Sequence, residues 1–256
     1  MKWLRMLGLY FERTFEYRLQ SLLWILIPII NNFTVILFWT GAKLNTSSLI
    51  SYYILMTIGG SFTTSHIEYN VSEIDIKQGQ LVNYLTKPIS YYWIELLAEI
   101  PYRVLQSVYA IIIISGILIF FPGVLKLSVH IFAIPFIICI FILGYHLSFT
   151  MKMSFAYLSF WFKDIQAVFE LLSIMAIIFS GGIMPIPWYP RILQIVCNIL
   201  PFAYSGYYTI IPLQGLVALP GIFSIILIQC VWLFVLILVH NFLWKRGIKE
   251  FTAVGQ

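Results

Sequence analysis

Charged residues are almost absent from six long apolar stretches of this 256-residue chain. Each stretch has about 18 to 24 residues, which is enough for a helix to cross a hydrocarbon core about 30 Å thick. Hydrophobic residues make up 61% of the chain and charged residues only 10%, more apolar surface than a soluble domain of this size can bury. We therefore predict an all-α membrane protein with six transmembrane helices, at residues 22–42, 48–67, 100–121, 129–150, 165–183 and 220–243.

The basic residues indicate on which side of the membrane each loop lies. With the N-terminus inside, the cytoplasmic segments, including the tail at 244–256, carry 12 of the 15 Lys and Arg residues, and Lys43, Lys126 and Arg191 remain outside. Because Lys and Arg accumulate in short cytoplasmic loops, both termini are predicted to be cytoplasmic in a multi-pass protein of a bacterial plasma membrane. Attraction to anionic inner-leaflet lipid accounts for the net charge of +5, so no nucleic-acid partner is needed.

Residues 1–20 are predicted to form an amphipathic helix in the membrane surface. At about 100° per residue, the large apolar side chains fall on one side of this helix and most charged side chains on the other. The apolar side consists of Trp3, Leu4, Leu7, Tyr10, Phe11 and Phe15. The alternative is a helix packed against the protein's own soluble parts, but the chain has few such parts.

Residues 68–99 form the one predicted cytoplasmic connection that is large enough to offer a partner a structured surface. A short helix over about 79–86, ended by Pro88, would place Leu81, Tyr84 and Leu85 on one face. That face could rest on the bilayer or dock into a groove on another protein. Composition does not choose between the two.

Ionisable residues also occur at the start of the third span. Glu95, Glu99 and Arg103 follow one another at i, i+4 and i+8. We interpret them as an ion-paired start of the helix, with a proton relay as the alternative.

Glu170 lies about a turn and a half inside the fifth span, where a carboxylate is costly unless it faces protein or water. We expect it to pair with Lys163 or Lys152. Coupling to an ion gradient is the alternative role.

Residues 184–212 connect the fifth and sixth spans on the predicted outer side. Pro185, Pro187 and Pro190 cannot continue a helix, yet the following residues are too apolar for a solvated loop. We predict two short helices, over about 190–200 and 203–211, that dip into the outer leaflet or cap the bundle. An aromatic belt at headgroup level would then contain Trp188, Tyr189, Tyr204, Tyr207 and Tyr208.

Polar side chains inside the first two spans mark either helix packing or a pathway. Asn31 and Asn32 lie in the middle of the first span, and the second span carries small, weakly polar residues from Thr57 to Thr64, including Ser61. Such faces pack helices together or line a substrate cavity.

The sequence contains no phosphate-binding loop and no catalytic or metal-binding motif. We therefore predict that the chain is not an enzyme. Energy for any pumping must come from an ion gradient or from another subunit. No internal inverted repeat is evident, which weakens the case for a secondary carrier.

The order of these features resembles the permease subunits of type-two ATP-binding-cassette (ABC) exporters, and in particular a bacterial subfamily of similar length. The amphipathic N-terminal helix, the six spans, the loop after the second span and the paired outer helices all take part, so the resemblance covers essentially the whole chain. The segments that carry it are Gly79–Ser90, Ser180–Pro190 with Leu200–Phe202, and Trp244–Gly255.

The resemblance implies a half-transporter that dimerises with itself or with a related permease and binds two copies of a separate ATPase, which would hold ATP and Mg²⁺. In such exporters the loop after the second span carries a coupling helix that inserts into a groove on the ATPase. The residues at that position here are Gly79, Leu81, Tyr84, Leu85, Lys87 and Pro88. The N-terminal helix also contacts the ATPase in this family.

Spans one, two and five line the transport path in these exporters. This would expose four residues to cargo: Asn31, Asn32, Ser61 and Ser173. The alternative function is an ATP-independent carrier or channel that uses Glu170 and the two asparagines.

Overall fold

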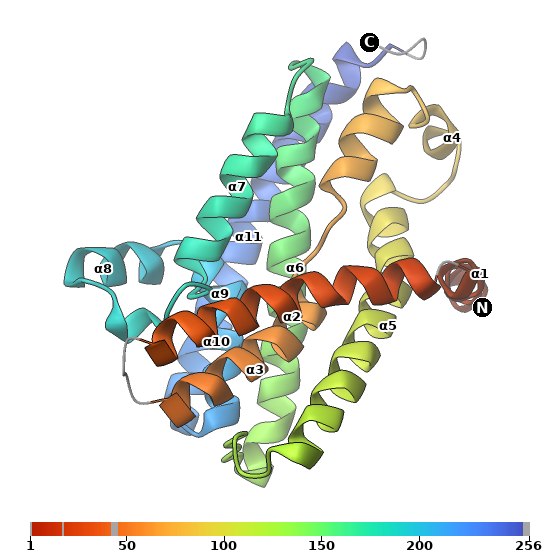
Figure 1. Ribbon diagram of the computed structural model, residues 1–256. Coiled ribbons are helices and arrows are strands. Elements are labelled where there is room, and N and C mark those ends of the chain that lie inside the picture. Colours follow the sequence, from red (N-terminus) through yellow and green to blue (C-terminus); the bar gives the residue numbers. More distant parts are fainter. Residues whose placement is uncertain (1, 17, 42–45, 253–256) are drawn as a thin grey trace.

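The computed structural model describes residues 2–16, 18–41 and 46–252, without the side chains of residues 2–4, 18, 20–21 and 46–47 (Figure 1). The predicted roles of Trp3, Leu4, Lys43 and the last residues of the Trp244–Gly255 segment therefore fall outside what is described. Helices and turns make up the described part of the chain, which contains no strand. This confirms the predicted all-α class.

Seven longer helices form the body of the molecule. In chain order they are α1 (Lys2–Glu16), α2 (Arg18–Gly41), α3 (Thr46–Thr63), α5 (Tyr91–Phe120), α6 (Ile134–Ala156), α7 (Gln166–Phe179) and α11 (Leu219–Glu250). Nine short elements join them: η1 (Asn70–Lys77), α4 (Val82–Leu85), η2 (Ile131–Ala133), η3 (Tyr157–Phe160), η4 (Ile186–Trp188), α8 (Arg191–Ile199), α9 (Phe202–Ser205), α10 (Tyr207–Ile210) and η5 (Ile211–Gln214).

Four helical segments of the described residues are long and apolar enough to cross a membrane: Leu22–Gly41, Tyr91–Phe120, Ile131–Phe160 and Leu219–Glu250. The predicted second and fifth spans correspond to α3 and α7. Many hydroxyl-bearing residues lower the hydropathy of α3, and α7 has only 14 residues. Six spans therefore remain a prediction, while four spans follow from length and composition.

Helix α7 is short because the chain turns sharply after it. It ends at Phe179, and Gly181 adopts a φ of 84°, a left-handed conformation that favours glycine. At about 1.5 Å per residue, α7 is about 21 Å long, less than the hydrocarbon thickness. Helices α8, α9 and α10 lie near its end (Figure 1), and Tyr207 N–H donates to the Ser180 carbonyl at 2.9 Å.

The outer connection differs in part from its predicted form. α8 occupies the place of the predicted helix over 190–200, whereas the predicted helix over 203–211 is divided into α9 and α10 at Gly206. Gly206 lies so close to Ser180 that an added Cβ would stand 2.8 Å from the Ser180 carbonyl oxygen. The break therefore lets the two short helices pack directly on the turn after α7.

Two hydrophobic clusters stabilise the bundle. The α10 cluster joins α3, α6, α11 and the short helices α9 and α10, with Tyr53, Ile140 and Ile210 at its centre. The η1 cluster joins η1, η3, the start of α5 and the end of α6, with Leu81 and Tyr157 fully buried. The two clusters meet in the second half of α6. Buried polar side chains are concentrated there.

The weakly polar face of α3 is a packing surface within this chain. Gly59 lies against Ile210, Thr57 accepts a hydrogen bond from Asn32 Nδ2 at 2.7 Å, and Ser61 lies beside Ser107 on α5. In the structure these residues of α3 take part in helix packing, which is one of the two interpretations given above.

Gly247 on α11 allows the ring of Phe160 to lie against the helix backbone, since an added Cβ would stand 2.2 Å from Phe160 Cδ2. Phe160 is buried and cannot turn outward. Gly247→Ala is therefore expected to lower the free energy of unfolding by about 1–3 kcal/mol. Gly116→Ala on α5 is the control, because no atom lies within 4 Å of a Cβ there. Unfolding in mixed micelles by SDS titration measures both, and equal effects would contradict the packing argument.

Candidate coupling surface and transport path

The predicted coupling segment follows η1 through a tight turn. Gly79 has a φ of 76°, and Leu81 N–H donates to the Asp75 carbonyl at 2.8 Å, which folds the chain back on η1. Only the four residues Val82–Leu85 are helical, so the segment is shorter than the predicted helix over 79–86. Pro88 follows on the exposed side.

The side chains of this segment do not share one exposed face as predicted. Leu81 is 0% exposed and belongs to the η1 cluster, so it holds the turn in place and cannot contact a partner. Val82 and Leu85 are 38% and 44% exposed. Tyr84 lies between, half-buried against the ring of Tyr91, with Lys87 Nζ 4.7 Å from its ring centre.

Asp75 connects this segment to α5. Its carboxylate is buried and accepts a hydrogen bond from the Tyr91 hydroxyl. Burial raises the pKa of Asp75, and the hydrogen bond from Tyr91 partly offsets that rise. Stability that depends on this group is therefore greatest at low pH and is lost as pH rises through the raised pKa.

Helix α1 lies against α5 (Figure 1). Burial raises the pKa of Tyr10 on α1, the nearby carboxylate of Glu95 on α5 adds to the rise, and Arg13 opposes it. Burial likewise raises the pKa of Tyr84, with Glu95 adding to it. The carboxylate of Glu95 on α5 therefore acts on a tyrosine of each predicted contact element, Tyr10 on α1 and Tyr84 on α4.

The four predicted path residues are not gathered at one place. Asn32 and Ser61 are engaged between helices, as described above, and Ser61 Oγ also donates to the Ile58 carbonyl at 2.6 Å. Asn31 on α2 and Ser173 on α7 are exposed on the surface of the chain. Two of the four residues are therefore at the surface, and two lie between helices.

The expected pairing of Glu170 with Lys152 is wrong. Lys152 Nζ forms an ion pair with Glu68 Oε1 at 2.8 Å instead. Glu170 is exposed on α7, where Gln166 Nε2 lies 3.4 Å from its Oε1, and within the described ranges it has no ion pair with Lys163 or any other residue. Its carboxylate faces the same side of α7 as Ser173.

Three tyrosines of the predicted aromatic belt, Tyr189, Tyr204 and Tyr207, are buried within the protein, and the headgroup level of the belt remains a prediction. Tyr189 and Tyr204 donate to the carbonyls of Ile178 and Asn198 at 2.8 and 3.0 Å. With Tyr207, they belong to the α10 cluster. Tyr208 is half-buried and donates to Asn198 Oδ1 at 2.6 Å. Of the five, Trp188 alone is exposed, with its ring edge-on to Trp39.

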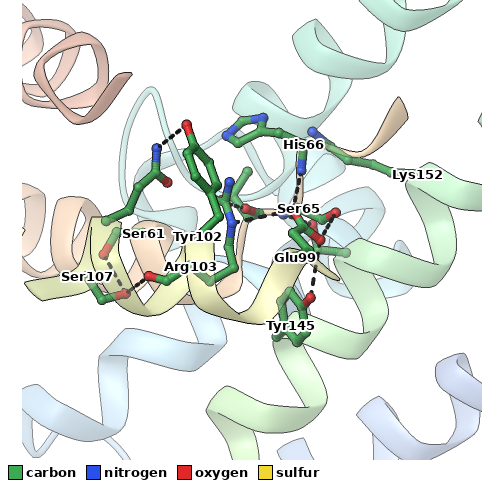
Figure 2. A network of polar contacts seen from close by, with 12 residues as sticks. Ser61, Ser65, His66, Glu99, Tyr102, Arg103, Ser107, Tyr145 and Lys152 are labelled. Atoms are coloured by element: carbon green, nitrogen blue, oxygen red, sulfur yellow. Dashed lines mark hydrogen bonds and ion pairs between the residues drawn. The ribbon is translucent and has the colours of Figure 1, made fainter. Parts of the chain in front are cut away.

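A buried polar layer lies where the two clusters meet and contains Ser65, Glu99 and Arg103, with the half-buried Tyr145 at its side (Figure 2). The main-chain N–H of His66, whose residue is exposed, also donates to Glu99. The i, i+4 spacing of Glu99 and Arg103 predicted their ion pair, which has an Nε–Oε1 distance of 3.4 Å. Glu95 takes no part in that pair. The other partners come from the segment that follows α3 and from α6, and no local pattern indicates them.

Within the part of the chain that the structure describes, no group of three or more His, Cys, Asp or Glu residues could hold a metal ion. Residues 21–255 match the model of a protein family described as ABC-2 family transporter protein. No match was found among curated proteins or among solved structures.

Proposed function

Because the chain belongs to the ABC-2 family of transporter proteins, we propose that it is the permease subunit of an ATP-driven exporter. The family is one of membrane permeases rather than enzymes, and membership implies association with an ABC ATPase. The observation that carries the proposal is the family match over residues 21–255 of a helical chain with at least four membrane-spanning segments among its described residues.

In this proposal the exporter contains two permease subunits, identical or related, and two ATPase subunits that bind ATP and Mg²⁺. It lies in a bacterial plasma membrane with both termini of each permease in the cytoplasm. The exposed Val82 and Leu85 on α4 support a contact with the ATPase at this segment. ATP binding would close the ATPase pair, and the permease halves would rock from inward to outward access.

The proposal is tested by purifying the tagged chain from its native membrane in mild detergent and identifying co-purified proteins by mass spectrometry. The expected partner carries a phosphate-binding loop, and the complex hydrolyses ATP. Inside-out vesicles should then take up cargo only when ATP is supplied. Gradient-driven uptake by the chain alone, abolished by Glu170→Gln, would contradict the proposal. It would support the ATP-independent carrier, which is favoured by the exposed position of Glu170 and by its lack of an ion pair among the described residues.

A further inference from the structure

A groove of about 690 Å³ runs between α5 and α6 beside the buried polar layer. Its walls are mainly apolar, with Leu97 and Val104 on α5, Phe141 and Ile142 on α6, and Phe62 on α3. Along α5 the lining extends from Trp93 to Val104, about 16 Å at 1.5 Å per residue. This is about the depth of one leaflet of the hydrocarbon core.

The polar layer forms one part of the groove wall, because Arg103, Tyr145 and His146 also line it. The carboxylate of Glu99 has no acceptor capacity to spare there. Its Oε1 accepts from His66 N–H at 2.8 Å and faces Arg103 Nε, while its Oε2 accepts from Ser65 Oγ at 2.7 Å and Tyr145 Oη at 3.2 Å.

Arg103, by contrast, has donors to spare. Its Nη1 donates to the Thr64 carbonyl and its Nε faces Glu99 Oε1 at 3.4 Å, but Nη2 has no hydrogen-bond partner among the described residues, although the residue is only 4% exposed. A buried guanidinium with unmet N–H groups costs free energy until an acceptor reaches it. The layer therefore favours an added anion and disfavours an added cation.

We propose that this groove binds one anionic phospholipid of the inner leaflet. The lipid phosphate accepts hydrogen bonds from Arg103, which matches phosphate geometry through its planar fork of donors. An acyl chain lies along Leu97, Val104 and Ile142. The site depends on insertion of α5 and α6 into the bilayer and is independent of ATPase coupling.

A lipid fits this groove better than free phosphate does, because apolar side chains line most of it. Val104 and Ile142 are themselves exposed on the chain surface, so the groove opens toward the space that lipid tails fill. The groove also lies on the predicted cytoplasmic side, where anionic lipids are concentrated and basic pockets between spans bind their headgroups.

The experiment is native mass spectrometry of the purified chain titrated with phosphatidylglycerol, phosphatidylethanolamine or inorganic phosphate. One phosphatidylglycerol should bind about tenfold more tightly than phosphatidylethanolamine, and phosphate alone should not compete. Val104→Trp, which fills the groove without changing charge, should weaken binding of phosphatidylglycerol at least tenfold. Ile112→Trp, an exposed position of α5 outside the groove, should bind like the unmodified chain.

Three results would overturn the site: unchanged binding in Val104→Trp, equal binding of the two lipids, or binding of phosphate as tight as that of phosphatidylglycerol. Each variant is first checked for a single symmetric peak in size-exclusion chromatography. If Val104→Trp does not pass, Ile142→Trp replaces it, since Ile142 lines the same groove from the other helix. Arg103→Lys, which keeps the positive charge but removes the planar set of N–H donors, should reduce the preference for phosphatidylglycerol over phosphatidylethanolamine.

Discussion

Replacement of Glu99 by alanine is expected to lower the free energy of unfolding by about 3–5 kcal/mol, because it leaves the buried guanidinium of Arg103 without its counter-ion. The same change removes the acceptor for Ser65 Oγ, His66 N–H and Tyr145 Oη. Unfolding by SDS titration in mixed micelles measures the loss. No other single ion pair among the described residues is as deeply buried on both sides.

Glu73→Ala is the matched control, since Glu73 also pairs with a basic residue at i+4, Lys77, at 2.7 Å, but in a more exposed place. Exposed pairs of this kind contribute about 0.3–0.5 kcal/mol. The double variant Glu99→Ala with Arg103→Leu should recover part of the loss, because it removes the unpaired charge as well. An effect of Glu99→Ala no larger than that of Glu73→Ala would show that the polar layer contributes little to stability.

Sequence patterns located the helices well where the signal was a lack of charge and less well where charged residues continue a helix. α5 begins at Tyr91, not near residue 100, because Glu95 and Glu99 interrupt the apolar pattern without interrupting the helix. Their side chains are buried by the η1 segment, α1 and α3, which compensates for their polarity. Hydropathy alone does not register such tertiary partners.

For single side chains of the site, too, the sequence predicted contacts within one helix better than contacts between distant segments. The Glu99–Arg103 pair could be predicted because both residues lie on one helix four positions apart. Leu81 was assigned to an exposed face because helical periodicity was assumed to continue through it. In the structure, Gly79 turns the chain there and directs Leu81 into the η1 cluster. Gly79, two residues before the apolar pair Leu81-Val82, was the available signal for that turn.

The aromatic residues of the outer connection were assigned to the membrane interface from composition, because Tyr and Trp are enriched there. In the structure the hydroxyl groups of Tyr189 and Tyr204 donate to the main-chain carbonyls of Ile178 and Asn198. These acceptors are available because Ile178 and Asn198 lie in the last turns of α7 and α8, where carbonyl groups lack partners within the helix. The positions of the rings thus depend on where the helices end. The prolines predict that the helices end within this region, but they do not predict at which residue.

The largest expected functional effect concerns α4. Val82→Asp combined with Leu85→Asp should reduce co-purification of the ATPase about a hundredfold or more, since two exposed apolar side chains at the centre of an interface each contribute about 2 kcal/mol. The permease itself should remain folded, because neither side chain belongs to a buried cluster. Co-purification and ATP hydrolysis in detergent measure the coupling, and size-exclusion chromatography measures the fold.

Two variants of the same segment separate coupling from folding. Leu81→Ala should lower the free energy of unfolding by about 2–5 kcal/mol, because Leu81 is fully buried, and should reduce the yield of the permease rather than its affinity for the ATPase. Asn83→Asp adds charge to the exposed surface of α4 without removing an apolar side chain, and so should leave co-purification nearly unchanged. If the double variant at Val82 and Leu85 still retains the ATPase, the coupling contact must lie elsewhere, and α1 is then the element to test.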